Sequence, residues 1–133
     1  MAARYLLDSN VLILHLRESE EVVRLLTQWA QRSDLYISVA TRTEIMAGMR
    51  PREQAVTMSL LDSLINLPVT VPIADRAGRW LYDYGRQGVQ LSFADSLIAA
   101  TAVEHELTLV TINLKHFPML EQEQVQALNS ISF

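Results

Sequence analysis

The sequence predicts an α/β fold with three layers, α/β/α, and a central parallel sheet of four to five strands. Short apolar runs bounded by turn residues alternate with longer stretches of helical period, an order that builds a parallel sheet covered by helices on both faces. Half of the 133 residues are hydrophobic, which supplies a generous core. No repeat, low-complexity tract or linker interrupts the pattern, so we expect one domain over residues 1–133.

The first half of the chain contains two of the expected strands. Tyr5–Leu7 is an apolar run followed by helical patterns over residues 10–17 and Glu20–Arg32. In the second of these helices apolar side chains recur at i, i+3, i+4 and i+7, the period of an amphipathic helix. A second strand is expected over residues 35–39, followed by a helix from about residue 41 to residue 49.

The second half contains the remaining strands. Pro51 suits the first turn of a helix, Gly88 suits a helix end, and Ser92 suits a helix cap. The expected order is a helix over residues 51–67, a strand over 69–73, helices over 75–86 and 92–106, a strand over 107–110, and a short fifth strand in the tail from Val125.

Three acidic residues, Asp8, Glu44 and Asp95, stand where predicted helices begin. Asp8 follows the first expected strand, and Glu44 comes shortly after the second. Asp95 begins the helix before the fourth strand, and such a helix runs antiparallel to its strand, so all three are expected at the carboxyl edge of the sheet, where ligands bind. Three converging carboxylates repel one another unless a cation lies among them. This arrangement favours a hard divalent ion and the phosphate chemistry that such ions support.

Helix capping is the alternative explanation for each acid. Ser92 and Asp95 have the spacing of a capping box, Thr41 and Glu44 nearly so, and Asp8 could cap the first helix. Capping does not explain why all three surround one cleft, so we favour a shared site. The other acids considered are expected to be solvated charges: Asp62, Asp75, Asp83, Glu104 and Glu121.

The composition excludes several classes of protein. The absence of cysteine excludes a disulfide framework and fits a reducing cytoplasm, and the three histidines lack the spacing of a metal site. We expect a cytoplasmic protein without a signal peptide or membrane span, because the N-terminus runs straight into a strand and no apolar stretch approaches about 18 residues. The net charge of −4 attracts no nucleic acid globally, although arginines beside the cleft could bind phosphate.

Four motifs in order resemble one family. The motifs are Leu-Asp-Ser-Asn-Val-Leu-Ile at residues 7–13, Ser-Val through Thr-Glu-Ile-Met-Ala-Gly at 38–48, Leu-Ser-Phe-Ala-Asp-Ser-Leu-Ile-Ala-Ala-Thr-Ala at 91–102, and Leu-Val-Thr-Ile-Asn-Leu-Lys-His-Phe at 109–117. Each alone is weak, but together they span nearly the whole chain. On these motifs the chain resembles a PIN-domain ribonuclease of the VapC toxin type, which implies a PIN-like fold.

The resemblance implies a metal-dependent endoribonuclease that is the toxin of a toxin–antitoxin pair. It assigns Asp8, Glu44 and Asp95 as the catalytic triad, with Mg²⁺ or Mn²⁺ held mainly by Asp8 and Asp95. Asn10 and Thr111 match supporting positions. Many relatives carry a fourth acid where this chain has Asn113, which leaves open whether one or two metal ions bind.

The expected reaction is hydrolysis of an RNA phosphodiester. The metal polarises the phosphate and activates a water that Glu44 orients, and the resemblance implies a 5′-phosphate product, with transfer RNA the favoured substrate. The resemblance and the acidic cleft also imply an antitoxin whose cationic C-terminal segment enters the cleft, and a homodimer that uses leftover apolar surface. The arginines considered for RNA binding are Arg42, Arg50, Arg52 and Arg86.

Two rival functions remain open at this stage. An aspartyl-phosphate phosphotransferase also places an aspartate after the first strand, but dehalogenase-like phosphatases need a second acid where this chain has Asn10, and the acidic pair of receiver domains is not evident. The other rival is a catalytically weak PIN-like module that binds RNA or protein, in which Asn113 would mark a degenerate site. A nuclease assay with and without EDTA separates this module from an enzyme.

Overall fold

The computed structural model describes residues 4–17 and 19–128, so the first three residues, used above to predict the lack of a signal peptide, lie outside it. Five strands form one wholly parallel sheet in the order β3-β2-β1-β4-β5. The predicted α/β/α class and the upper limit of the strand number are confirmed. The strands are β1 (Tyr5–Leu7), β2 (Leu35–Ser38), β3 (Ile65–Leu67), β4 (Thr108–Thr111) and β5 (Val125–Ala127).

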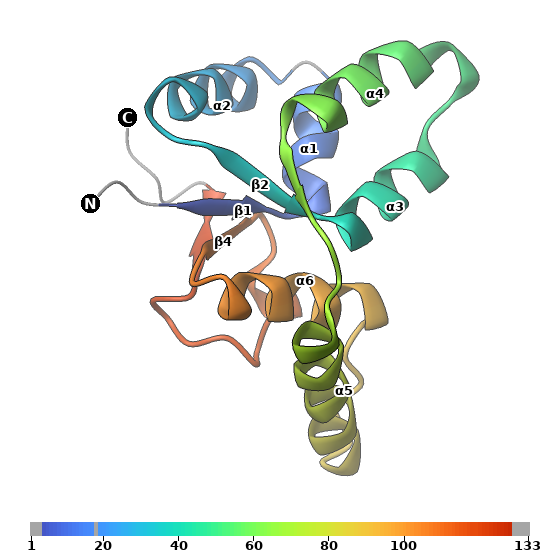
Figure 1. The fold of residues 1–133 in the computed structure, drawn as a ribbon, viewed down its shortest axis with the longest axis vertical. Coiled ribbons are helices and arrows are strands. Elements are labelled where there is room, and N and C mark those ends of the chain that lie inside the picture. Colours follow the sequence, from blue (N-terminus) through green and yellow to red (C-terminus); the bar gives the residue numbers. More distant parts are fainter. Residues whose placement is uncertain (1–3, 18, 129–133) are drawn as a thin grey trace.

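Helices cover both faces of the sheet (Figure 1). One face carries α1 (Ser9–Leu16), α2 (Glu20–Arg32) and α4 (Gln54–Ser63), and the other carries α6 (Phe93–Glu104). The longest helix, α5 (Val71–Arg86), packs on α6 rather than on the strands. The remaining elements are α3 (Val39–Gly48) and two short 3₁₀ helices, η1 (Pro51–Glu53) and η2 (Leu114–His116).

Two hydrophobic cores lie on opposite faces because side chains alternate along each strand. Leu7 of β1 packs in the core with α1 and α2, whereas its neighbour Leu6 packs in the core with Ile98 of α6 and Phe117. All four side chains are at most 2% exposed. The strand β1 therefore lies at the centre of the molecule, with apolar helices on both sides.

Strand register brings the ends of β1 and β4 together. Leu7 is paired with Val110, and the backbone N–H of Asp8 donates to the carbonyl oxygen of Val110 at 3.0 Å. The residues that follow, Asp8 and Thr111, consequently meet at the carboxyl edge of the sheet. This pairing positions the first acidic residue of the predicted site.

The prediction of a third strand over residues 69–73 is wrong. The strand is Ile65–Leu67, and α4 ends at Ser63, where the expected helix continued to residue 67. Asn66 ends the helix, because its amide donates to the carbonyl oxygens of Leu61 and Leu64, each at 2.9 Å.

The helix expected from residue 75 begins four residues earlier, at Val71. Its cap is Thr70, whose hydroxyl accepts from the backbone N–H of Ile73 at 3.4 Å, and Pro72 lies in the first turn. A threonine cap followed by an early proline is a helix start signal that outweighed the apolar residues of this segment.

The remaining boundaries differ from prediction by a few residues. The second strand ends at Ser38 rather than residue 39, and the helix α3 begins at Val39 rather than residue 41, since the Ser38 hydroxyl caps it by accepting from the backbone N–H of Ala40 at 3.0 Å. The fifth strand in the tail is confirmed at Val125–Ala127. Among the helices of residues 4–17 and 19–128, none is both long and apolar enough to cross a membrane.

Candidate active site

Asp8 is the most buried of the three predicted acids, with only 3% of its surface exposed. It is the N-cap of α1, and its Oδ1 accepts from the backbone N–H of Ser9 at 2.8 Å. Its other oxygen, Oδ2, accepts from the hydroxyl of Thr111 at 2.7 Å. Asp8 is therefore a cap, as the alternative explanation proposed, but the second bond fixes its carboxylate toward the end of β4. Each oxygen keeps a further lone pair for another ligand.

Glu44 is not at a helix start, so the capping explanation for it is wrong. It is the sixth residue of α3, which Ser38 caps, and Thr41 lies inside the helix with its hydroxyl unpartnered among the described residues. The Glu44 carboxylate instead accepts a hydrogen bond from the hydroxyl of Ser9 at 2.6 Å. This contact joins α3 to the residue that follows Asp8.

Asp95 lies in the first turn of α6, where Ser92 is the cap. The Ser92 hydroxyl accepts from the backbone N–H of Asp95 at 3.2 Å, which is one half of the predicted capping box. The Asp95 side chain turns to His116, with 3.6 Å between Oδ2 and Nδ1. Asp95 thus lies at a helix start and also faces a second element of the site.

The pKa values of Asp8 and Asp95 are raised mainly by burial, and the charges of the other acids add to the rise. Burial raises the pKa of Asp8, and the charge of Glu44 raises it further, while the Thr111 and Ser9 hydrogen bonds oppose the rise. Burial, followed by the charges of Asp8 and Glu44, raises the pKa of Asp95 to about 6, although His116 works in the opposite direction. The charges of Asp8 and Glu44 therefore act on Asp95, and the charge of Glu44 acts on Asp8.

His116 is a site residue that the sequence placed nearby but did not assign. Its Nδ1 approaches Asp95, and its Nε2 lies 2.9 Å from the side-chain nitrogen of Asn113. Asn113 is oriented in turn by its backbone N–H, which donates to the Thr111 hydroxyl at 3.0 Å. Asn113 thus links Thr111 to His116. The only signal for His116 was its position five residues after Thr111, at the end of η2.

The donor set has the chemistry that suits a magnesium or manganese ion. Asp8, Glu44 and Asp95 supply carboxylate oxygens, which hard divalent cations prefer, and such a cation would oppose the burial and the neighbouring negative charge that raise the pKa of Asp8 and Asp95. In the arrangement of residues 4–17 and 19–128, no three acidic or histidine side chains lie close enough together to hold an ion. Half-buried Asn10, in the first turn of α1, makes no side-chain hydrogen bond within these residues.

The four predicted RNA-binding arginines lie in different surroundings. Arg42 is engaged within the fold, because its guanidinium donates to Asp62 at 2.9 Å and to Asn66 at 3.0 Å. Arg52 is exposed on η1, and Arg86 ends α5 with its guanidinium 5.5 Å from the ring of Tyr82. The end of α5 points away from the sheet (Figure 1).

Two acids expected to be solvated are in fact paired. Asp62 accepts from Arg42, and Glu104 accepts from Arg76 at 2.6 Å. Both pairs join residues far apart in the sequence, which the local pattern could not predict.

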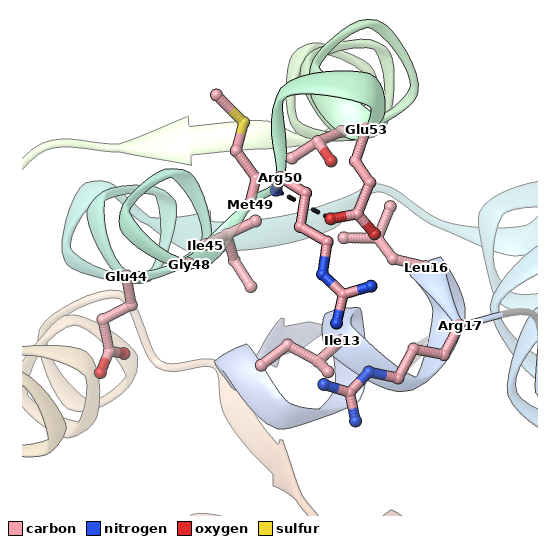
Figure 2. Close-up of a pocket in the computed structure, with 10 residues that line it drawn as sticks. Ile13, Leu16, Arg17, Glu44, Ile45, Gly48, Met49, Arg50 and Glu53 are labelled. Carbon is pink, nitrogen blue, oxygen red and sulfur yellow. Dashed lines mark hydrogen bonds between the residues drawn. The ribbon is translucent and has the colours of Figure 1, made fainter.

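A cavity of about 420 Å³ opens beside Glu44, between α1, α3 and η1 (Figure 2). Its floor contains Ile13 and Ile45, and two arginines, Arg17 and Arg50, lie at the end opposite Glu44. Arg50 is the one predicted RNA-binding arginine that lines this cavity. Arg17 was not among the predicted residues.

Comparisons with known proteins identify the family of the chain. The PIN domain family model matches residues 5–117. The chain is 41% identical over 117 residues to Ribonuclease VapC10 of Mycobacterium tuberculosis, and the alignment covers 88% of each protein.

Solved structures share the fold. VapBC2 from Rickettsia felis, solved with a DNA fragment from its promoter, has a TM-score of 0.79 and 21% identity, and the match covers 92% of this chain and 97% of that one. A toxin–antitoxin complex from Klebsiella pneumoniae has a TM-score of 0.75 and 28% identity, with coverage of 94% and 96%. Since the family model spans most of the chain, including Asp8, Glu44 and Asp95, the chain belongs to the PIN domain family.

Proposed function

We propose that this protein is a metal-dependent endoribonuclease and the toxin of a toxin–antitoxin pair. The observation that carries the proposal is the 41% identity of this PIN-domain chain to a protein named as a ribonuclease, and the placement of Asp8, Glu44 and Asp95 toward the carboxyl edge of the parallel sheet supports it. A phosphotransferase that forms an aspartyl-phosphate is disfavoured, because the chain belongs to the PIN domain family and its relative is named as a ribonuclease.

Asp8 and Asp95 would hold Mg²⁺ or Mn²⁺. When bound, such an ion polarises a phosphate oxygen and lowers the pKa of a coordinated water. Thr111 keeps the Asp8 carboxylate in one orientation. Burial raises the pKa of Asp8, so binding of a cation by this acid would be coupled to release of a proton.

Glu44 would orient the attacking water. Its carboxylate is exposed and is held from one side by the Ser9 hydroxyl at 2.6 Å, which leaves its remaining lone pairs for water. Hydrolysis assisted in this way breaks the bond between phosphorus and the 3′ oxygen, and leaves the phosphate on the 5′ side of the downstream nucleotide. The substrate that we favour is a transfer RNA.

The partners that we propose are an antitoxin and a second copy of the chain. The solved relatives include toxin–antitoxin complexes, and an arginine of an antitoxin could replace the cation between the carboxylates. A homodimer would cover the large apolar side chains that the fold leaves exposed. Such side chains include Val71, Tyr82, Val89, Phe93 and Ile112. The place of action is the cytoplasm.

An Asp8→Asn variant tests the proposal. Asparagine is as good an N-cap as aspartate, so α1 should remain folded while the charge needed for the cation is lost. The parent protein with Mn²⁺ should cleave structured RNA, and both EDTA and Asp8→Asn should abolish cleavage. Cleavage that persists in excess EDTA would refute metal dependence. RNA binding without any cleavage would favour the catalytically weak module.

A further inference from the structure

The cavity beside Glu44 carries two cationic side chains from separate elements. Arg17 follows the last turn of α1, and Arg50 precedes η1, yet both side chains line the same cavity, and the Arg50 guanidinium extends toward the side on which Arg17 lies (Figure 2). The two residues are 33 positions apart in the sequence, so their convergence is a product of the fold.

Within residues 4–17 and 19–128, no carboxylate forms an ion pair with Arg17 or Arg50. Glu53 lines the same cavity, but its carboxylate accepts from the backbone N–H of Arg50 at 2.8 Å. Among the described residues neither guanidinium belongs to an ion pair, in contrast to Arg42, which donates to Asp62. Two like charges facing one another are repulsive unless an anion lies between them.

We infer that Arg17 and Arg50 form a binding site for a backbone phosphate of the RNA substrate, next to the scissile phosphate. Arginine presents a planar fork of N–H donors that matches two phosphate oxygens, and the pair offers two forks to one anion. This inference rests on the proposed ribonuclease function for the identity of the ligand. The presence of an anion site rests only on the geometry.

The position of the site relative to the acids supports a neighbouring phosphate. Glu44 lines the cavity at the end opposite the arginines, and it reaches Ser9 beside Asp8 (Figure 2). From Glu44 to Gly48, α3 extends by about 6 Å. An RNA strand that places one phosphate at the acids can therefore pass along this cavity, with the next phosphates toward the arginines and the sugar edges over Ile13 and Ile45.

Direct binding of RNA in EDTA tests the inference without requiring catalysis. Arg17→Gln, Arg50→Gln and the double variant would be titrated against a fluorescent single-stranded RNA at several salt concentrations. Arg32→Gln is the matched control, because Arg32 is also exposed but ends α2 at the opposite edge of the sheet, before β2 begins. Melting curves would verify that each variant is folded.

The expected result is a loss of affinity of about tenfold for each single variant, and a larger loss for the double variant. The slope of log affinity against log salt should fall by about 0.7 for each phosphate contact removed. Arg32→Gln should behave as the parent protein does.

Unchanged affinity and salt slope in the double variant would overturn the inference, and so would a parent protein that does not bind RNA. If the variants bind RNA normally but no longer bind the antitoxin, the cavity is a protein-docking site and the inference is again overturned. Cleavage by the parent protein is measured separately. Its absence would refute the proposed nuclease while leaving the result on RNA binding intact.

Discussion

The hydroxyl of Thr111 donates to the Oδ2 atom of Asp8 at 2.7 Å across 103 residues of sequence. Both groups are buried, and the contact joins the ends of the paired strands β1 and β4. The same hydroxyl accepts from the backbone N–H of Asn113. One side chain therefore fixes the orientation of the most buried acid and the start of the segment that carries His116.

Replacing Thr111 by valine should weaken cation binding at the site without leaving a cavity in the core. Valine keeps the shape of the side chain but leaves Asp8 Oδ2 without its donor, so the pKa of Asp8 should rise further and its carboxylate should bind a cation less well. Loss of a hydrogen bond that orients a ligand typically costs 10- to 100-fold in metal affinity or activity. We expect a loss in this range in manganese titrations of RNA cleavage. Thr111→Ser should retain most activity, and equal losses in both variants would contradict this role of the hydroxyl.

The contribution of Asp95 to the stability of the metal-free protein should decrease as the pH rises from about 4 to about 6, whereas partly buried His15, whose pKa is lowered, acts in the opposite direction. In this window Asp95 is still protonated in the folded state, where its pKa is about 6, but already ionised in the unfolded state, where its pKa is near 3.8. The folded state then binds more protons, so the free energy of unfolding falls with rising pH. The raised pKa of Asp8 acts in the same direction.

Chemical denaturation in EDTA at several pH values measures this effect. The slope should be shallower in Asp95→Asn, although Asp8 preserves part of it. If the stability of the parent protein rises through this window by as much as the stability of Asp95→Asn does, Asp95 does not titrate as proposed.

Element order and strand direction could be predicted because they depend on patterns that are local in sequence. The third strand could not, because Ile65–Leu67 is a three-residue edge strand with only partly buried side chains. Its apolar residues continue the helical pattern of α4, and pairing with Tyr36, Ile37 and Ser38 decides its structure. Tertiary pairing outweighed the local preference.

The approximate position of the three acids could be predicted because the carboxyl edge of a parallel sheet collects the residues that follow its strands and the first turns of the helices that lead back into it. Their individual contacts could not. Ser9 binds Glu44 across 35 residues, and His116 meets Asp95 through the turn after β4. Such contacts depend on side-chain orientation in the folded chain, which the sequence pattern does not specify.

Replacing Arg42 by glutamine should lower stability but leave RNA affinity unchanged. Its guanidinium bridges Asp62 and Asn66, and Asn66 in turn ends α4. The ion pair is mostly solvent-accessible on the Asp62 side, which is 65% exposed, so its loss should cost at most about 1 kcal/mol. That corresponds to a decrease in Tm of roughly 2–5 °C. An unchanged Tm together with weaker RNA binding would instead identify Arg42 as an RNA ligand.

Asp95→Asn distinguishes a helix cap from a metal ligand. If Asp95 only supports the first turn of α6, the variant should lose up to about 1 kcal/mol and keep the full rise in Tm with added Mn²⁺. If Asp95 is a ligand beside Asp8 and Glu44, removing its charge relieves repulsion, and the metal-free variant should melt no lower than the parent at pH 7. Its Tm should then hardly respond to Mn²⁺, because an ion that binds only the folded state stabilises it in proportion to its affinity. We expect the second result. Melting curves across a manganese titration measure both quantities, and a less stable variant with the parent's full response to Mn²⁺ would identify Asp95 as a cap alone.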